Sequence, residues 1–270
     1  MFRQHLYVHA AQGERDFRWR GHEISRIEGL TDGVFALAIA LLVISMEVPR
    51  TFDELAEAFV QTPVFLACFA TLFWCWHAHF QFHRRYGLEN PLTLFLNGVL
   101  IFLVALYVYP LKFLFGLLWN GMILRRGFNV LDSYGNPVLD GEGRHIPAVG
   151  EIGDHLDLMT LYGLGFAAVF GIFFLMTLHA WAWRERLELD ARERVLTKAG
   201  LWAHAISVGF GAGSALIAGF ARDPLMAGCL YFGIGPLQTV NGIYWDRRVG
   251  RLRPAVERAE ELADDPVGGS

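Results

Sequence analysis

Charged residues and cysteines are scarce in this sequence of 270 residues. Only 19% of the residues are charged, whereas a soluble domain usually has about 25%. The three cysteines are too few for a disulfide framework, and none has the spacing of a metal-binding pair. The net charge of −4 does not match the basic surface of a nucleic-acid-binding protein, so we expect no nucleic-acid partner.

Recognisable enzyme motifs are absent as well. The sequence contains no P-loop, no dinucleotide-binding fingerprint and no nucleophile motif, so we do not expect an enzyme. The sequence is rich in apolar residues: 54% of its residues are hydrophobic, and it contains 22 phenylalanines and 8 tryptophans. This composition excludes a disordered chain and indicates a protein that crosses a membrane several times.

Apolar stretches in the sequence are close to or above the length of about 20 residues that a membrane-crossing helix needs. The predicted spans are residues 25–46, 64–84, 92–118, 158–183, 199–221 and 225–245. We therefore predict an all-α polytopic membrane protein with six transmembrane helices. The polar segment at 120–157 is expected to form an exposed loop on the non-cytoplasmic side.

Basic residues are distributed unevenly between the predicted loops. Arginines precede the first span, follow the second, lie between the fourth and fifth, and follow the sixth. By the positive-inside rule these segments lie in the cytoplasm, which places both termini there. The predicted organisation is a cytoplasmic segment at 1–24, a transmembrane domain at 25–246 and a cytoplasmic tail at 247–270.

The first span begins with an unusual polar stretch. Ser25 and Glu28 have the spacing of a capping box, which predicts a helix start at this point. Asp32 follows about 10 Å along the helix axis, at 1.5 Å per residue. A carboxylate at that depth needs partners inside the protein. We interpret Asp32 as a structural hydrogen-bonding centre in preference to a proton or ion relay.

Helical periodicity separates Asp32 from an apolar stripe on the same helix. At about 100° per residue, Leu37, Leu41 and Ile44 share one narrow face, and Asp32 lies almost opposite. Periodicity alone favours lipid contact or ordinary packing for this stripe. Candidate polar partners for Asp32 are His79 near the end of the second span and Asn97 near the start of the third, because both fall at a similar depth.

Two histidines in the second span leave another possibility open. His79 and His83 are four residues apart, a spacing that places both imidazoles on one helix face and can bind a metal. No acidic or cysteine ligand with matching spacing accompanies them. A membrane-embedded metal or haem protein is therefore kept as an alternative, and a non-conducting membrane scaffold is another.

A resemblance to a known family rests on three short motifs. Arg26 followed by residues 30–32 (Leu-Thr-Asp) resembles the Arg-x-x-x-Phe-Ser-Asp signature of the transmembrane protein 175 family. Residues 76–79 (Trp-His-Ala-His) and residues 96–97 (Leu-Asn) are similar to the family's Trp-x-x-His and Leu-Asn on the next two helices. The resemblance is specific over residues 26–110.

The resemblance implies a potassium-permeable, leak-like cation channel. Prokaryotic members of that family have one six-helix unit and assemble as homotetramers, so it also implies a homotetramer in a prokaryotic inner membrane, with no cofactor. The family's pore is lined by the first helix of each subunit, and its apolar constriction corresponds to Leu37, Leu41 and Ile44. Ala40 stands where members usually have a threonine that is linked to potassium preference.

The same resemblance implies a structural polar network behind the pore helix. Its members would be Arg26, Thr31, Asp32, Trp76, His79 and Asn97. Such a network would brace the first helix against the next two. No potassium-channel filter of backbone carbonyls is visible in the sequence, so any selectivity has to come from a narrow apolar ring that partly dehydrates the ion.

Overall fold

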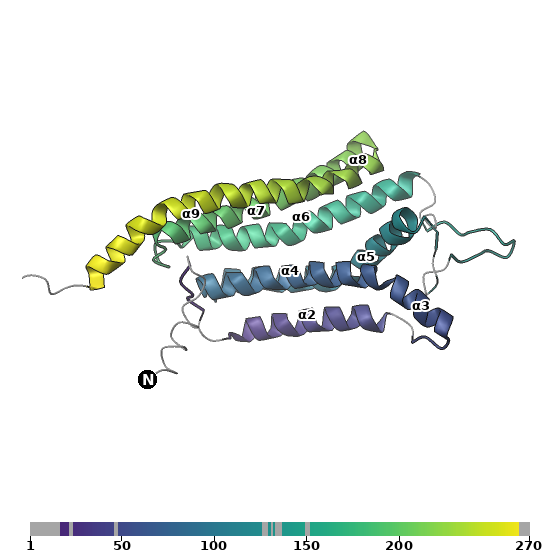
Figure 1. The fold of residues 1–270 in the computed structure, drawn as a ribbon, viewed down its shortest axis with the longest axis horizontal. Helices are drawn as coiled ribbons and strands as arrows, with labels where there is room; N and C mark the ends of the chain where they lie inside the picture. Colours follow the sequence, from purple (N-terminus) through teal and green to yellow (C-terminus); the bar gives the residue numbers. More distant parts are fainter. Residues whose placement is uncertain are drawn as a thin grey trace, which may run out of the picture.

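The computed structural model describes residues 17–21, 24–45, 48–125, 129–130, 132, 137–148 and 152–264. The described residues form a bundle of long helices (Figure 1). The helices are α2 (Arg26–Ile44), α3 (Phe52–Val60), α4 (Thr62–Tyr86), α5 (Pro91–Leu118), α6 (Ile152–Ala182), α7 (Ala191–Leu216), α8 (Pro224–Cys229) and α9 (Ile234–Asp264). Two isolated β-bridges, Asn129 with Pro147 and Leu139 with His145, lie in the α5–α6 connection.

Short π-helical and 3₁₀ segments extend some of these helices. A π-helical turn at Trp119–Ile123 (η1) continues α5, and another at Ile217–Ala221 (η2) continues α7. A 3₁₀ turn at Leu230–Gly233 (η3) joins α8 to α9. Because η1 takes up residues predicted to be loop, the connection to α6 is shorter than the predicted loop at 120–157.

Among the described residues, five helices are long and apolar enough to cross a membrane. They are α2, α4, α5 with η1, α6, and α7 with η2. The predicted sixth span, residues 225–245, is instead divided among α8, η3 and the first turns of α9. Gly233 and Gly235 flank the start of α9, and Pro236 lacks a backbone N–H, which explains the break.

Two other features differ from the predicted organisation. Helix α3 lies between the first two spans, where no element is predicted from the sequence. Thr51 caps it by accepting a hydrogen bond from the backbone N–H of Glu54. The predicted tail at 247–270 is helical as far as Asp264, because α9 continues beyond the bundle (Figure 1). Of the predicted segment at 1–24, only residues 17–21 and 24 lie among the described residues.

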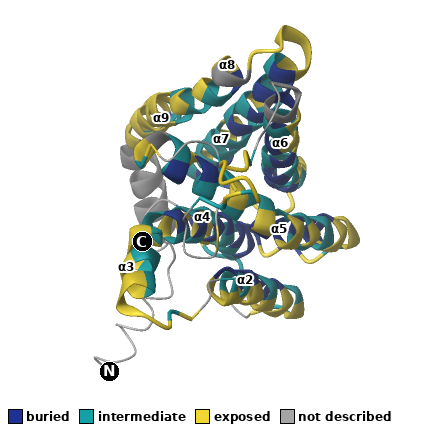
Figure 2. Cartoon of the chain, turned by 90° about the vertical axis from the view of Figure 1, so that its right-hand side faces the viewer, coloured by how far each residue is buried: buried dark blue, intermediate teal, exposed yellow. Residues whose placement is uncertain are grey.

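The long helices lie in layers. Helix α2 lies on one side of α4 and α5, and α6, α7 and α9 lie on the other side (Figures 1 and 2). The main core forms where the layers meet and contains Phe35 and Leu42 from α2, Leu72 from α4, Leu100 from α5 and Phe173 from α6. The described N-terminal residues and the far end of α9 lie at the same end of the bundle (Figure 1).

Helices α6 and α7 make the most extensive helix contact of the described bundle, and two glycines face each other within it. A Cβ at Gly163 would lie 2.7 Å from the carbonyl oxygen of Gly211, and a Cβ at Gly211 would lie 2.8 Å from the carbonyl oxygen of Gly163. Small residues of this kind let helix backbones approach each other within a membrane. The contact fixes the position of α7 against α6. The following segments α8, η3 and α9 run back along α7.

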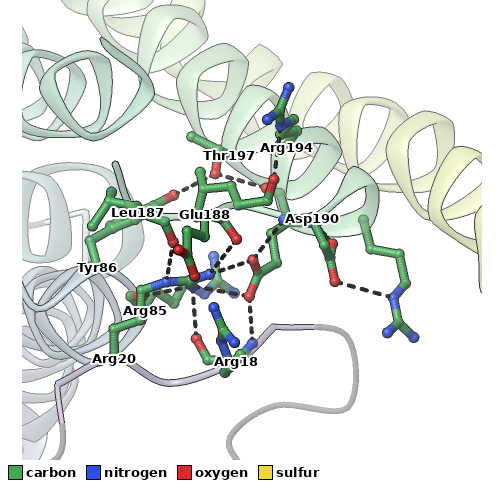
Figure 3. A network of polar contacts seen from close by, with 12 residues as sticks. Arg18, Arg20, Arg85, Tyr86, Leu187, Glu188, Asp190, Arg194 and Thr197 are labelled. Carbon is green, nitrogen blue, oxygen red and sulfur yellow. Dashed lines mark hydrogen bonds and ion pairs between the residues drawn. The ribbon is translucent and has the colours of Figure 1, made fainter. Parts of the chain in front are cut away.

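A buried ion pair connects the N-terminal segment to the α6–α7 turn (Figure 3). The Arg20 guanidinium lies 2.6 Å from Glu193 Oε2, and the two side chains are only 13% and 2% exposed. Arg20 also donates to the carbonyl oxygen of Leu187, and the backbone N–H of Arg20 donates to the carbonyl oxygen of Arg84 at the end of α4. One arginine therefore ties α4 to α7.

Replacing Arg20 by methionine should destabilise the protein, because the Glu193 carboxylate would stay buried without its cation. Removing one partner of a buried pair costs about 3 kcal/mol or more. The measurement is the midpoint of thermal unfolding in detergent. The control is Arg144→Met, which removes an exposed ion pair with Glu142 in the α5–α6 connection and should change the midpoint little. Equal midpoints for the two variants would contradict this role.

Candidate functional site

Helix α2 has two unlike faces. Its buried side chains are spaced by three or four residues and contact α4 and α5: Glu28, Thr31, Phe35, Ala38 and Leu42. The start of the helix has the predicted capping box, in which the Ser25 hydroxyl accepts from the Glu28 backbone N–H and the Ser25 N–H donates to the Glu28 carboxylate. The opposite face is open in the single chain.

The residues of the predicted constriction lie on or beside this open face. Leu37 is 58% exposed and Ile44 is 74% exposed, and Ala40 is also exposed between them. Leu41 is half-buried and packs against the main core, so it lies at the edge of the face. A contiguous apolar face on a membrane helix must be covered by lipid or by protein.

The buried face of α2 is joined to α5 by a hydrogen bond. The side-chain amide of Asn97 donates to the Thr31 hydroxyl over 2.8 Å, and both residues are fully buried. The Thr31 hydroxyl in turn donates to the carbonyl oxygen of Ile27 one turn earlier. This contact fixes the rotation of α2 about its axis, because Thr31 must point at α5.

A second hydrogen bond joins α2 to α4. The indole N–H of Trp76 donates to Asp32 Oδ1 over 2.8 Å. Asp32 is exposed in the single chain, and along the helix it lies about 140° from Leu37. The structure thus gives Asp32 a partner on a neighbouring helix and points it away from the apolar stripe.

The rings of His79 and His83 lie next to each other within the bundle, tilted by 50°. Each is only 1% exposed, and their ring centroids are 4.4 Å apart. In the part of the chain that the structure describes, Nε2 of both rings has no hydrogen-bond partner, and the same is true of Asn97 Oδ1. No group of three or more metal-ligating residues occurs among the described residues, so a third ligand for a metal at His79 and His83 is not found there.

Arg26 takes no part in the contacts of the predicted network. Its side chain is exposed, and no hydrogen bond or ion pair joins it to another described residue. The structure joins Thr31 with Asn97 and Asp32 with Trp76 by hydrogen bonds, and the side chain of Asn97 also interacts with His79. His79 lies beside His83.

A contact that the sequence did not reveal holds the other end of α2. The Lys112 ammonium on α5 donates to the carbonyl oxygen of Ser45 over 2.9 Å and to its hydroxyl over 2.7 Å. Ser45 is the residue that ends α2, and a cation is favourable at a helix C-terminus. Both residues line a cavity of about 550 Å³ between α2, α4 and α5. In the sequence, the only indication of this contact is that Lys112 is a charged residue within an apolar span.

Comparisons with known proteins agree with this geometry. The sequence model of the family described as endosomal/lysosomal potassium channel TMEM175 matches residues 26–108, which cover α2, α3, α4 and most of α5. A protein of Marivirga tractuosa named potassium channel is 33% identical over 248 residues, which are 88% of this chain and 94% of the relative. The chain belongs to the TMEM175 family.

Other members of the TMEM175 family support the assignment. The crystal structure of a threonine-to-alanine variant of the potassium channel MtTMEM175, in complex with a nanobody–MBP fusion protein, superposes with a TM-score of 0.70 at 32% identity. The superposition covers 87% of this chain and 99% of the MtTMEM175 chain. A potassium channel of Chamaesiphon minutus is 30% identical over 96 residues, or 33% of this chain and 47% of the relative. TMEM175 proteins are membrane channels and not enzymes.

Replacing Asp32 by alanine should lower stability, because it leaves the Trp76 indole N–H without its acceptor. An unsatisfied buried polar group costs about 1–3 kcal/mol, and the low end applies here because Asp32 is exposed in the single chain. The measurement is a double-mutant cycle of thermal unfolding with Asp32→Ala, Trp76→Phe and the double variant. We expect the double variant to lose less stability than the sum of the single variants. Additive losses would show that the hydrogen bond does not brace α2.

Proposed function

We propose that the protein conducts potassium as a homotetramer whose pore is lined by the open face of α2. The observation that carries the proposal is the exposed apolar stripe of Leu37, Ala40 and Ile44 on a helix whose other face is fixed by hydrogen bonds to α4 and α5. Relatives named potassium channels share the family. Four copies arranged around an axis would cover this stripe with protein and leave a narrow path along it.

Passage along such a path is controlled by dehydration of the permeating ion. Rings of leucine and isoleucine offer no ligands to an ion, so a cation passes only by losing part of its hydration shell. Potassium loses water more readily than sodium, and therefore a narrow apolar constriction favours potassium. The rings at Leu37 and Ile44 would lie about 10 Å apart along the helix. Leu41 would contribute less, because it is half-buried against the core.

Selectivity in this arrangement should be modest. Ala40 lies on the open face between the two rings and carries no hydroxyl that could replace a water molecule of the ion. A narrow apolar constriction can also close by dewetting, in which water leaves the pore and ions no longer pass. This stops conduction without a large movement of the backbone. We infer a leak-like pathway with a weak preference for potassium.

The proposed topology has six crossings and both termini in the cytoplasm. The sixth crossing would consist of α8, η3 and the start of α9, which together run back along α7 (Figure 1). Basic residues support this orientation, because Arg20, Arg84 and Arg186 belong to segments at one end of the bundle. The bacterial relatives support a prokaryotic inner membrane. We place the membrane domain at residues 25–246.

Potassium flux into liposomes tests the proposed pore. Leu37→Asn should raise flux several-fold and reduce the preference for potassium over sodium, because an amide ring lowers the cost of dehydration. The matched control is Val43→Asn. Val43 is 51% exposed on the same helix but lies about 120° from Leu37, so its substitution should leave the flux ratio unchanged. Size-exclusion chromatography confirms the oligomer for each variant.

Three outcomes of this experiment would contradict the proposal. If the wild-type protein passes no potassium in a stable oligomer, the protein is a scaffold and not a channel. If folded Leu37→Asn and Ile44→Asn variants conduct as the wild type does, α2 does not line the pore. A larger effect of Val43→Asn than of Leu37→Asn would place the pore on a different face of α2.

Cysteine labelling tests the orientation. In a Cys229→Ser background, which removes the exposed native thiol, Glu142→Cys should react with a membrane-impermeant maleimide added to intact cells. Glu188→Cys, in the turn between α6 and α7, should react only after the membrane is permeabilised. The reverse pattern, or labelling of both from outside, would contradict the proposed topology.

A further inference from the structure

Two cations lie against one tryptophan where α6 ends and α7 begins. The Arg184 guanidinium is 5.0 Å from the Trp181 ring centroid, and the Lys198 ammonium is 4.9 Å from the same centroid. Next to them, the guanidinium of Arg186 is 4.6 Å from the centroid of Trp183. Attraction to the ring faces holds these long side chains in place, so the end of the α6–α7 pair presents an ordered set of positive charges.

These charges are only partly neutralised. Lys198 is exposed, and no ion pair connects it to any acidic residue in the described ranges. Arg184 has one acidic neighbour, since its Nε lies 3.5 Å from Glu185 Oε1. The same carboxylate group is also paired with Arg194 over 3.1 Å. One carboxylate is thus shared by two arginines while Lys198 has none, so Arg184, Glu185, Arg194 and Lys198 together carry a net positive charge.

An apolar surface begins directly beside the cations. On α7, Lys198, Trp202 and Leu216 lie on one face by helical periodicity, and Trp202 is 59% exposed. On the neighbouring helix α6, Leu178 is exposed one turn before Trp181. Helices α6 and α7 are separated from α2 by α4 and α5 (Figures 1 and 2). In an assembly organised around α2, this surface lies at the periphery, where the bilayer is.

We propose that this surface binds an anionic phospholipid. Its phosphate contacts Lys198 and Arg184, and its acyl chains lie along the exposed stripe of α7 beside Leu178. Three properties agree with this occupant: tryptophans occupy the membrane–water interface, basic residues at that level attract anionic headgroups, and the adjoining side chains are apolar. A zwitterionic lipid fits the apolar stripe equally well, but its net charge of zero does not match the cations.

The proposed site goes beyond ion conduction, and it rests on the proposed function only in that an assembly around α2 leaves α6 and α7 at the periphery. Lys198 follows Thr197, whose hydroxyl accepts a hydrogen bond from Tyr86 at the end of α4 (Figure 3). Glu193, the partner of Arg20, lies on the first turn of the same helix. A lipid bound to Lys198 therefore contacts the helix that carries the connection between α4 and α7. Lipid binding and ion flux are measured separately, so one can fail without the other.

Native mass spectrometry of the purified oligomer tests the site. The probes are phosphatidylglycerol and phosphatidylcholine with identical acyl chains. We expect the wild-type protein to retain phosphatidylglycerol in preference to phosphatidylcholine. The variant Lys198→Gln/Arg184→Gln should lose about tenfold in apparent affinity for phosphatidylglycerol, with its affinity for phosphatidylcholine unchanged. Trp202→Ala should weaken both lipids, because it removes apolar contact area.

The matched control is Arg222→Gln at the opposite end of α7, which should bind both lipids as the wild type does. Two results would overturn the proposal: equal retention of the two lipids by the wild-type protein, or unchanged phosphatidylglycerol affinity in the double variant. Lys198 is exposed, so Lys198→Gln alone should fold, and it should show part of the loss. A titration of the wild type at rising salt gives an independent measurement, in which the preference for phosphatidylglycerol should decrease.

Discussion

The hydrogen bond between Asn97 and Thr31 determines which face of α2 is available for function. Inside a membrane no water can replace a missing partner, so a fully buried hydroxyl and amide have to meet each other. Once Thr31 points at α5, the rotation of α2 is set. The leucine at position 37 then points away from the neighbouring helices. The indole of Trp76 adds a second restraint through Asp32, and Lys112 holds the far end at Ser45.

The other half of the bundle is held by a different kind of contact. Helices α6 and α7 approach through glycine backbones, and the ion pair of Arg20 with Glu193 connects them to the end of α4. Polar residues near the helix ends thus join the layers, whereas apolar side chains such as Phe173 and Leu100 fill the middle. This division is what a bilayer requires, because charge is tolerated near its surfaces and not at its centre.

Local patterns predicted much of α2 and little of the long-range contacts. The capping box of Ser25 and Glu28 and the 3.6-residue period are properties of adjacent residues, so the start of the helix and the separation of Asp32 from Leu37 could be predicted. The pairing of Arg20 with Glu193 joins residues 173 positions apart, so no local sequence pattern predicts it. Leu41 was placed in the stripe by its angle, yet only the packing of its neighbours shows that it is half-buried. Pro236 indicates a local kink in the last predicted span, but hydropathy does not show where along that span the α-helix changes to a 3₁₀ turn.

The glycine contact between α6 and α7 restricts how this sequence can evolve. A side chain at Gly163 would collide with the backbone of Gly211 and Ala215, and a side chain at Gly211 would collide with the backbone of Gly163 and Ala167. A collision between side chains can be relieved when a second mutation shrinks the partner. Here the nearest obstacles are main-chain atoms, and the methyl groups of Ala215 and Ala167 lie only slightly farther away at 3.0 Å. Shrinking those two alanines would leave the main-chain collisions in place. Substitution at either position has no compensating change across the contact, and the two positions should stay glycine together wherever α6 and α7 pack this way.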